Sequence, residues 1–87
     1  MEYKLSRQAR TNIKDIARYT KRYFGDDQTQ EYLGGLYYSF ELLAENPKLG
    51  REWSEGKRRY VYRMHIVYYR LTPSGPLITE VRHTAMA

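Results

Sequence analysis

The side chains best suited to phosphate chemistry lie in the last third of this sequence, where cations and imidazoles alternate with tyrosines. They are Arg58, Arg59, Arg63, His65, Arg70, Arg82 and His83. Cleavage of RNA without a metal needs a base for the 2′-hydroxyl, an acid for the leaving oxygen and cations on the phosphate. His65 and His83 could exchange protons, and Arg58 and Arg82 could hold the phosphate through paired N–H groups. These four residues are the candidate catalytic set if the chain is a ribonuclease.

A binding surface built from the same cations is the competing interpretation. Successive side chains of a strand point to opposite faces, so a regular strand would separate Arg82 from His83. The cations alternate with aromatic residues, which could stack on bases while the cations contact phosphates. Trp53, the single tryptophan, could be an exposed anchor for a partner or could plug the edge of the core.

Composition favours an anionic partner and excludes thiol chemistry. The 87 residues carry 15 Lys and Arg against 10 Asp and Glu, which gives a net charge of +5. This balance favours nucleic acid, an enzyme of nucleic acid or an acidic protein, although an ordinary basic surface would look the same. With no cysteine and two histidines, we expect no disulfide, metal or cofactor. No long apolar run or signal peptide is visible, which predicts a cytoplasmic protein without a membrane partner.

Two helices are predicted in the first half of the chain. Ser6 is a suitable N-cap for a helix over residues 7–24, and Gly25 can adopt the left-handed conformation that ends it. A second helix is predicted over residues 27–45, and Asn46 before a proline ends it. The short connection predicts an antiparallel helical hairpin. The apolar stripes of the two helices are Ala9, Ile13, Ile16, Ala17, Thr20, Phe24, Leu33, Leu36, Phe40, Leu43 and Ala44.

A pair of glycines, Gly34 and Gly35, interrupts the second predicted helix. Each glycine weakens a helix interior by about 1 kcal/mol relative to alanine. The pair is either a tolerated weakness or a site of close approach to the first helix.

The strands that would carry the cations follow the helices. Residues 2–5 predict an N-terminal strand, and residues 57–71 predict two strands joined by a tight turn near Arg63 and Met64. Residues 77–83 predict the last strand, while residues 48–56 are expected to form a loop and residues 84–87 a tail without structure. The order of strand, two helices and three strands indicates an α+β fold, with the helical hairpin packed on a small, mainly antiparallel sheet. A single domain is expected over residues 1–87.

Several strings of this sequence resemble the ParE branch of the RelE/ParE toxin superfamily. They are LSRQARTNIKDIARYT, ELLAENPKLGRE, RRYVYRMHIVYYRL and EVRHTAM. The most specific are L-x-E-N-P-x-L-G-R over residues 43–51 and Y-R-x-H-x-x-Y-Y-R over residues 62–70. Together the strings extend over residues 5–86, in an order and spacing similar to those of the family.

The resemblance implies a toxin of a type II toxin–antitoxin system with a helical hairpin against a small sheet. ParE-type members are associated with poisoning of DNA gyrase, which they trap on cleaved DNA. A ParD-like antitoxin neutralises them in a hetero-oligomer by wrapping a flexible segment over the toxin. No residue is then catalytic. The expected contacts with gyrase or nucleic acid are Trp53, Arg58, Arg59, Arg63, Arg82 and His83.

Two alternatives stay open beside the gyrase poison. One is a RelE-like, ribosome-dependent mRNA endoribonuclease, and the other is a non-toxic module that binds an antitoxin or nucleic acid. The sequence also departs from the family at its end: Ala85 stands where an arginine is common, and family chains commonly continue past Ala87.

Overall fold

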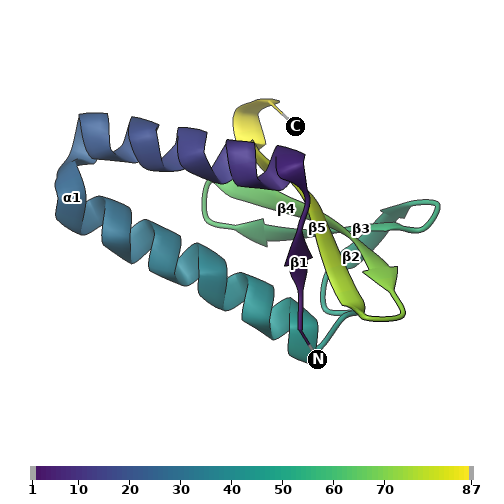
Figure 1. Cartoon of the computed structure of the whole chain (residues 1–87). Coiled ribbons are helices and arrows are strands. Elements are labelled where there is room, and N and C mark those ends of the chain that lie inside the picture. Colours follow the sequence, from purple (N-terminus) through teal and green to yellow (C-terminus); the bar gives the residue numbers. More distant parts are fainter. Residues whose placement is uncertain (1, 87) are drawn as a thin grey trace.

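The computed structural model describes residues 2–86, which form a helical layer and a five-stranded sheet (Figure 1). The elements are β1 (Lys4–Leu5), α1 (Arg7–Glu45), β2 (Arg51–Ser54), β3 (Lys57–Tyr62), β4 (His65–Thr72), β5 (Gly75–His83) and the 3₁₀ turn η1 (Thr84–Met86). The strand order is β1-β5-β4-β3-β2. β1 runs parallel to β5, and the other neighbours are antiparallel. The predicted α+β class is confirmed, with a mixed sheet. None of the described helices is long and apolar enough to cross a membrane.

The helical layer corrects the prediction of two helices, because residues 2–86 contain one α-helix, α1, which is interrupted at Gly25. The predicted N-cap is confirmed, since the Ser6 Oγ accepts a hydrogen bond from the Ala9 N–H at 3.0 Å. Inside α1 only Gly25 leaves helical geometry, with φ 88° and ψ 176°. One residue thus reverses the chain, and no loop over residues 25–27 separates two helices. Figure 1 shows the resulting first arm, residues 7–24, and second arm, residues 26–45.

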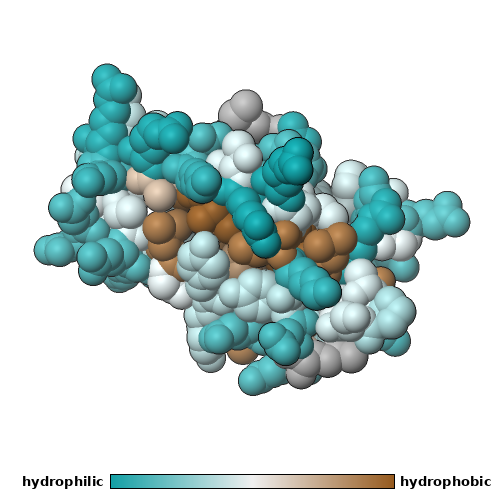
Figure 2. Space-filling model, viewed as in Figure 1, coloured by the Kyte–Doolittle hydropathy of each residue, from teal (hydrophilic) through white to brown (hydrophobic). Residues whose placement is uncertain are grey.

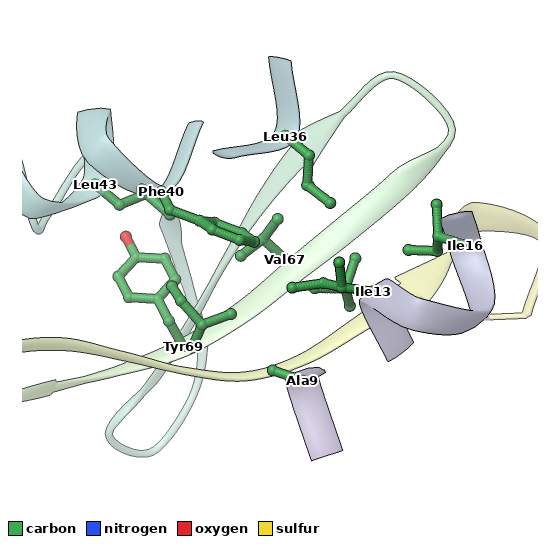
Figure 3. Packing of buried hydrophobic residues seen from close by; sticks show 10 residues of the cluster. Ala9, Ile13, Ile16, Leu36, Phe40, Leu43, Val67 and Tyr69 are labelled. Atoms are coloured by element: carbon green, nitrogen blue, oxygen red, sulfur yellow. The ribbon is translucent and has the colours of Figure 1, made fainter. Parts of the chain in front are cut away.

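The core lies between the two arms of α1 and one face of the sheet (Figure 3). Its members are Ala9, Ile13, Ile16, Leu36, Phe40, Leu43, Val67, Tyr69, Ile78 and Val81. The helical members are all from the predicted stripes, which confirms that spacing. Phe24 is the exception, because its side chain is 60% exposed. Figure 1 shows the reason: the reversal at Gly25 extends beyond the sheet, so the end of the stripe has no strand to cover it.

The glycine pair in the second arm approaches β3 rather than the first arm. A Cβ atom at Gly35 would overlap the hydroxyl of Tyr62, whereas one at Gly34 would meet nothing within 4 Å. The Tyr62 hydroxyl donates to the Tyr32 carbonyl one turn earlier, at 2.9 Å. Gly35 therefore admits Tyr62 against the helix backbone, and close approach explains this glycine but not Gly34.

The predicted loop over residues 48–56 contains the strand β2, which the sequence did not predict. β2 pairs antiparallel with β3, and a register shift between Glu52 and Ser54 leaves Trp53 in a bulge. The predicted turn at Arg63 and Met64 is confirmed, with a positive φ of 49° at Arg63. Residues 84–86, predicted to lack structure, form η1, and Ala87 lies outside the described residues.

Candidate functional site

The register of β4 and β5 brings the two histidines together. His65 is the cross-strand partner of His83 on one side and of Tyr62 on the other. The two imidazole rings are 5.3 Å apart and meet edge to face. The ring of Tyr32, from the second arm, packs against His65 and Tyr62, with centroid distances of 5.5 Å and 5.1 Å. We call Tyr32, Tyr62, Arg63, His65 and His83 the histidine cluster.

Hydrogen bonds define which ring nitrogens of the histidine cluster are occupied. The Met64 N–H donates to the Tyr32 hydroxyl oxygen at 3.2 Å, and the same hydroxyl is hydrogen-bonded to the His65 Nδ1, 2.6 Å away, in the direction that the imidazole tautomer sets. The Ala85 N–H donates to the His83 Nδ1 at 3.1 Å. The His83 Nδ1 is thus an acceptor, so the neutral form of that imidazole carries its proton on Nε2.

Burial in the histidine cluster disfavours the charged forms of His65 and Tyr32. Burial lowers the pKa of His65 below its ordinary value of 6.5, and the neighbouring His83 lowers it further. Burial likewise raises the pKa of Tyr32. The guanidinium of Arg63 lies over the rings of Tyr32 and Tyr62, at 5.9 and 5.6 Å from their centroids. His65 is therefore a neutral hydrogen-bonding group at neutral pH, with a cation beside it.

The four residues of the candidate ribonuclease set do not converge. Arg82 is the cross-strand partner of Ile66, so it points away from the face that holds His65 and His83, as its place next to His83 predicts. Arg58 lies near the other end of β3, opposite Tyr69. The structure therefore brings His65 and His83 together and separates both arginines from them.

Arg58 instead holds the segment that follows α1. Its Nε donates to the Gly50 carbonyl at 2.9 Å, and its terminal nitrogen donates to the Lys48 carbonyl at 3.3 Å. The Tyr69 hydroxyl donates to the Pro47 carbonyl at 2.7 Å and accepts from the Gly50 N–H at 2.8 Å. The segment of residues 47–50, within the family-like motif, is thus hydrogen-bonded to β3 through Arg58 and to β4 through Tyr69. Arg58 therefore stabilises the position of this segment.

The sheet surface opposite α1 carries the other cations, and we call it the open face. Its members, given by strand pairing and by contact, are Arg51, Trp53, Arg59, Val61, Ile66, Tyr68, Glu80 and Arg82. Trp53 is 49% exposed, its ring 5.5 Å from Tyr68, and the Arg59 guanidinium lies 5.9 Å from the indole. Three predicted contact residues, Trp53, Arg59 and Arg82, share this surface. Arg51 is a member that the sequence did not indicate, because it is the first residue of β2, the strand that was not predicted.

An open groove of about 970 Å³ lies between β1 and the second arm of α1. Apolar parts of Tyr3, Leu5, Tyr38 and Leu77 line it, and β1 is an edge strand of the sheet. In Figure 2 a band of hydrophobic residues runs between the two arms of α1 toward β1. The charged residues at this groove are of both signs: Glu2, Lys4, Arg10, Glu41 and Glu45. The groove therefore combines apolar contacts with a free strand edge.

The fold and the two surfaces define a small basic α+β domain with an aromatic, cationic sheet face and a groove of mixed polarity at the β1 edge. Among its described residues, no group of three His, Cys, Asp or Glu side chains is placed to hold a metal ion. The sequence matches, over residues 3–87, the family described as the ParE toxin of type II toxin–antitoxin system, parDE. The chain therefore belongs to the ParE toxin family, which confirms the resemblance.

Its relatives include toxins of the same type. The chain is 33% identical over 87 residues to Toxin ParE1 of Caulobacter vibrioides, an alignment that covers 97% of this chain and 90% of that one. It is 32% identical over 88 residues to Toxin ParE1 of Mycobacterium tuberculosis, with the same coverage. Its fold is similar to that of a chain from the chromosomal ParDE TA system of P. aeruginosa, with a TM-score of 0.82, 16% identity and coverage of 95% of each chain.

Proposed function

We propose that this protein poisons DNA gyrase by stabilising the complex of the enzyme with cleaved DNA, and that a ParD-like antitoxin neutralises it. Family membership supports the toxin role. The observation that carries the proposal is the open face, where Arg59 lies by the half-exposed Trp53, where Arg82 shares the same surface, and which α1 of the described chain leaves uncovered. The protein acts in the cytoplasm, where gyrase and its DNA are found.

Poisoning of this kind is binding rather than catalysis. A ligand shifts an equilibrium only by its differential affinity for the two states. The toxin must therefore bind the cleaved gyrase–DNA complex more tightly than the religated one. Cations on a rigid sheet can supply that difference if cleavage exposes phosphates or an acidic surface to Arg59 and Arg82.

The antitoxin is proposed to occupy the groove beside β1. An extended segment can add a strand to an exposed sheet edge, with backbone hydrogen bonds for affinity and side-chain pockets for specificity. Tyr3, Leu5 and Tyr38 would receive its apolar side chains. This groove lies at the β1 edge, so the antitoxin would leave the open face to be covered by another part of its chain, in a hetero-oligomer.

A cleavage assay tests the proposal. Purified protein is added to gyrase, ATP and supercoiled plasmid, and the products are treated with detergent and protease. The expected result is protein-linked linear DNA, and addition of the ParD-like antitoxin should prevent its formation. Intact plasmid together with ribosome-dependent cuts in messenger RNA would overturn the proposal.

The ribonuclease is the second candidate, and the His65–His83 pair favours it. Arg63, at the adjoining turn, is the predicted cation that shares this cluster, in place of Arg58 and Arg82. If the protein cuts messenger RNA on the ribosome, His83→Gln should abolish the cuts. If it poisons gyrase, the same variant should retain plasmid cleavage, provided that it stays folded.

A further inference from the structure

The open face places cations where they raise the energy of the folded protein. Arg51 and Arg59 are direct cross-strand partners, so their side chains emerge side by side from the same surface. Like charges directly opposite each other destabilise an antiparallel pair. Among the described residues the two ion pairs, Arg18–Asp15 and Lys21–Asp26, both lie on α1, and neither involves an open-face arginine. Such an arrangement indicates a site for a polyanion.

Trp53 gives this cationic surface a second chemical property. The bulge in β2 between Glu52 and Ser54 sets the indole against Tyr68, beneath the guanidinium of Arg59. Bulges commonly redirect a side chain near a functional site. The indole nevertheless remains 49% exposed. A flat aromatic ring beside arginines, on a sheet, is the arrangement that stacks a nucleobase while cations contact the adjoining phosphates.

We propose that the open face binds a single strand of DNA directly, with a base stacked on Trp53 and with phosphates held by Arg51, Arg59 and Arg82. An acidic protein surface would pair with the arginines, whereas a single strand of nucleic acid also offers the indole a flat base beside the charges. Glu80, also on this face, would repel a phosphate placed near it, so the phosphates would lie beside the arginines rather than beside Glu80. The assignment to DNA rests on the proposed function, in which the cleaved DNA of gyrase supplies the strand.

The protein carries its own reporter for this binding, because Trp53 is its single tryptophan. The wild-type protein is titrated at low salt with a fifteen-nucleotide deoxythymidine oligomer, and tryptophan fluorescence is followed. Base stacking should quench the emission. A polyglutamate of matched charge should cause little quenching. A uridine oligomer of the same length is titrated in parallel. The proposal would be overturned if the deoxythymidine oligomer did not bind, if polyglutamate quenched the emission equally, or if the uridine oligomer bound more tightly.

Two variants of equal net charge distinguish binding at the open face from a general effect of the protein's positive charge. Arg59→Gln and Lys14→Gln remove one positive charge each, the second from an exposed position on α1. By fluorescence anisotropy with a labelled oligomer, Arg59→Gln should weaken binding and reduce the slope of log affinity against log salt by about 0.7. Lys14→Gln should bind like wild type. Equal effects of the two variants would overturn a defined site.

Removal of the aromatic ring gives the second measurement. Trp53→Ala should weaken binding by about five- to a hundredfold, the loss expected for one stacked base. Trp53→Phe should restore most of the affinity, because it keeps a ring of the same orientation. Unchanged affinity in Trp53→Ala, with circular dichroism showing a folded protein, would contradict stacking.

The same preparation is tested for gyrase poisoning, so that the two proposals fail separately. Wild-type protein that yields protein-linked linear plasmid but binds no oligomer overturns the DNA site and leaves the proposed function. Wild-type protein that binds the oligomer through Trp53 but leaves gyrase unaffected overturns the proposed function and leaves the site.

Discussion

The hydroxyl of Tyr32 lies 2.6 Å from the Nδ1 of His65, and this hydrogen bond joins the second arm of α1 to β4. The same hydroxyl accepts the backbone N–H of Met64 in the β3–β4 turn. Tyr32 thereby positions a helix, a turn and an imidazole at once. The histidine cluster is consequently an organised part of the fold, whatever binds beside it.

Tyr32→Phe should lower the free energy of unfolding by about 1 kcal/mol, because it leaves the Met64 N–H and the His65 Nδ1 without their partner. Urea denaturation measures the change. Tyr19→Phe removes a hydroxyl from a residue that is 61% exposed and should leave stability unchanged. Equal stability of both variants would mean that the Tyr32 hydrogen bonds add nothing.

Acid should destabilise the protein through His65. Its pKa is lowered in the folded protein, mainly by burial and also by His83, so below pH 6.5 the unfolded chain binds the proton more readily. The contribution of His65 to stability is complete above about pH 6.5 and is lost as the pH falls toward the folded pKa. Urea midpoints between about pH 5.5 and 7.5 measure this slope.

His65→Asn provides the control for this pH dependence. Its side-chain oxygen can still accept from Tyr32, but it does not titrate. The variant should show a flatter dependence of the free energy of unfolding on pH over the same range. An unchanged slope would assign the effect to other groups.

The two adjacent glycines of the second arm should respond in opposite directions to alanine. Gly34→Ala adds a methyl group in open space and should stabilise the helix by up to about 1 kcal/mol. Gly35→Ala places its Cβ against the Tyr62 hydroxyl and should destabilise the protein by about 1–3 kcal/mol. Thermal unfolding compares the pair, and a stabilised Gly35→Ala protein would contradict this packing.

Substitutions of the two neighbouring arginines on β3 should differ in their effect on stability. Arg58→Ala should lower the free energy of unfolding by about 1–3 kcal/mol, because the Gly50 and Lys48 carbonyls lose a charged donor. Arg59→Gln should change it by less than about 0.5 kcal/mol, since the lost contact with Trp53 and the relieved repulsion by Arg51 oppose each other. Urea denaturation measures both changes. Comparable losses of unfolding free energy in the two variants would contradict a structural role for Arg58 and a surface position for Arg59.

Local sequence signals were sufficient for most of the fold. Ser6 and Asn46 are the caps of α1, and the tight turn at Arg63 and Met64 joins two strands, as predicted. β2 was missed because Trp53 lies in a bulge, which breaks the alternation that marks a strand. Gly25 ends the first arm with a positive φ, as predicted, but the structure has one helix, α1, in place of two with a connection between them, because this single residue is enough to reverse the chain.

The site depended on information that is not local. The contact of His65 with His83 follows from the register of β4 and β5, which a further irregularity beside Tyr68 and Tyr69 adjusts. The opposite roles of Arg58 and Arg59 follow from the face that each occupies, and a register error of one residue would exchange them. The residue types therefore indicated which cations were candidates for the site. Only the pairing of the strands showed which face of the sheet each cation occupies.

The most direct test of the account is the amount of protein-linked linear plasmid formed by gyrase with wild-type protein, Arg59→Gln and Lys14→Gln. The account predicts abundant linear DNA with wild type and Lys14→Gln, and much less with Arg59→Gln at equal stability. Absence of linear DNA with the wild-type protein would contradict gyrase poisoning. Full activity of Arg59→Gln would contradict the role of the open face in it.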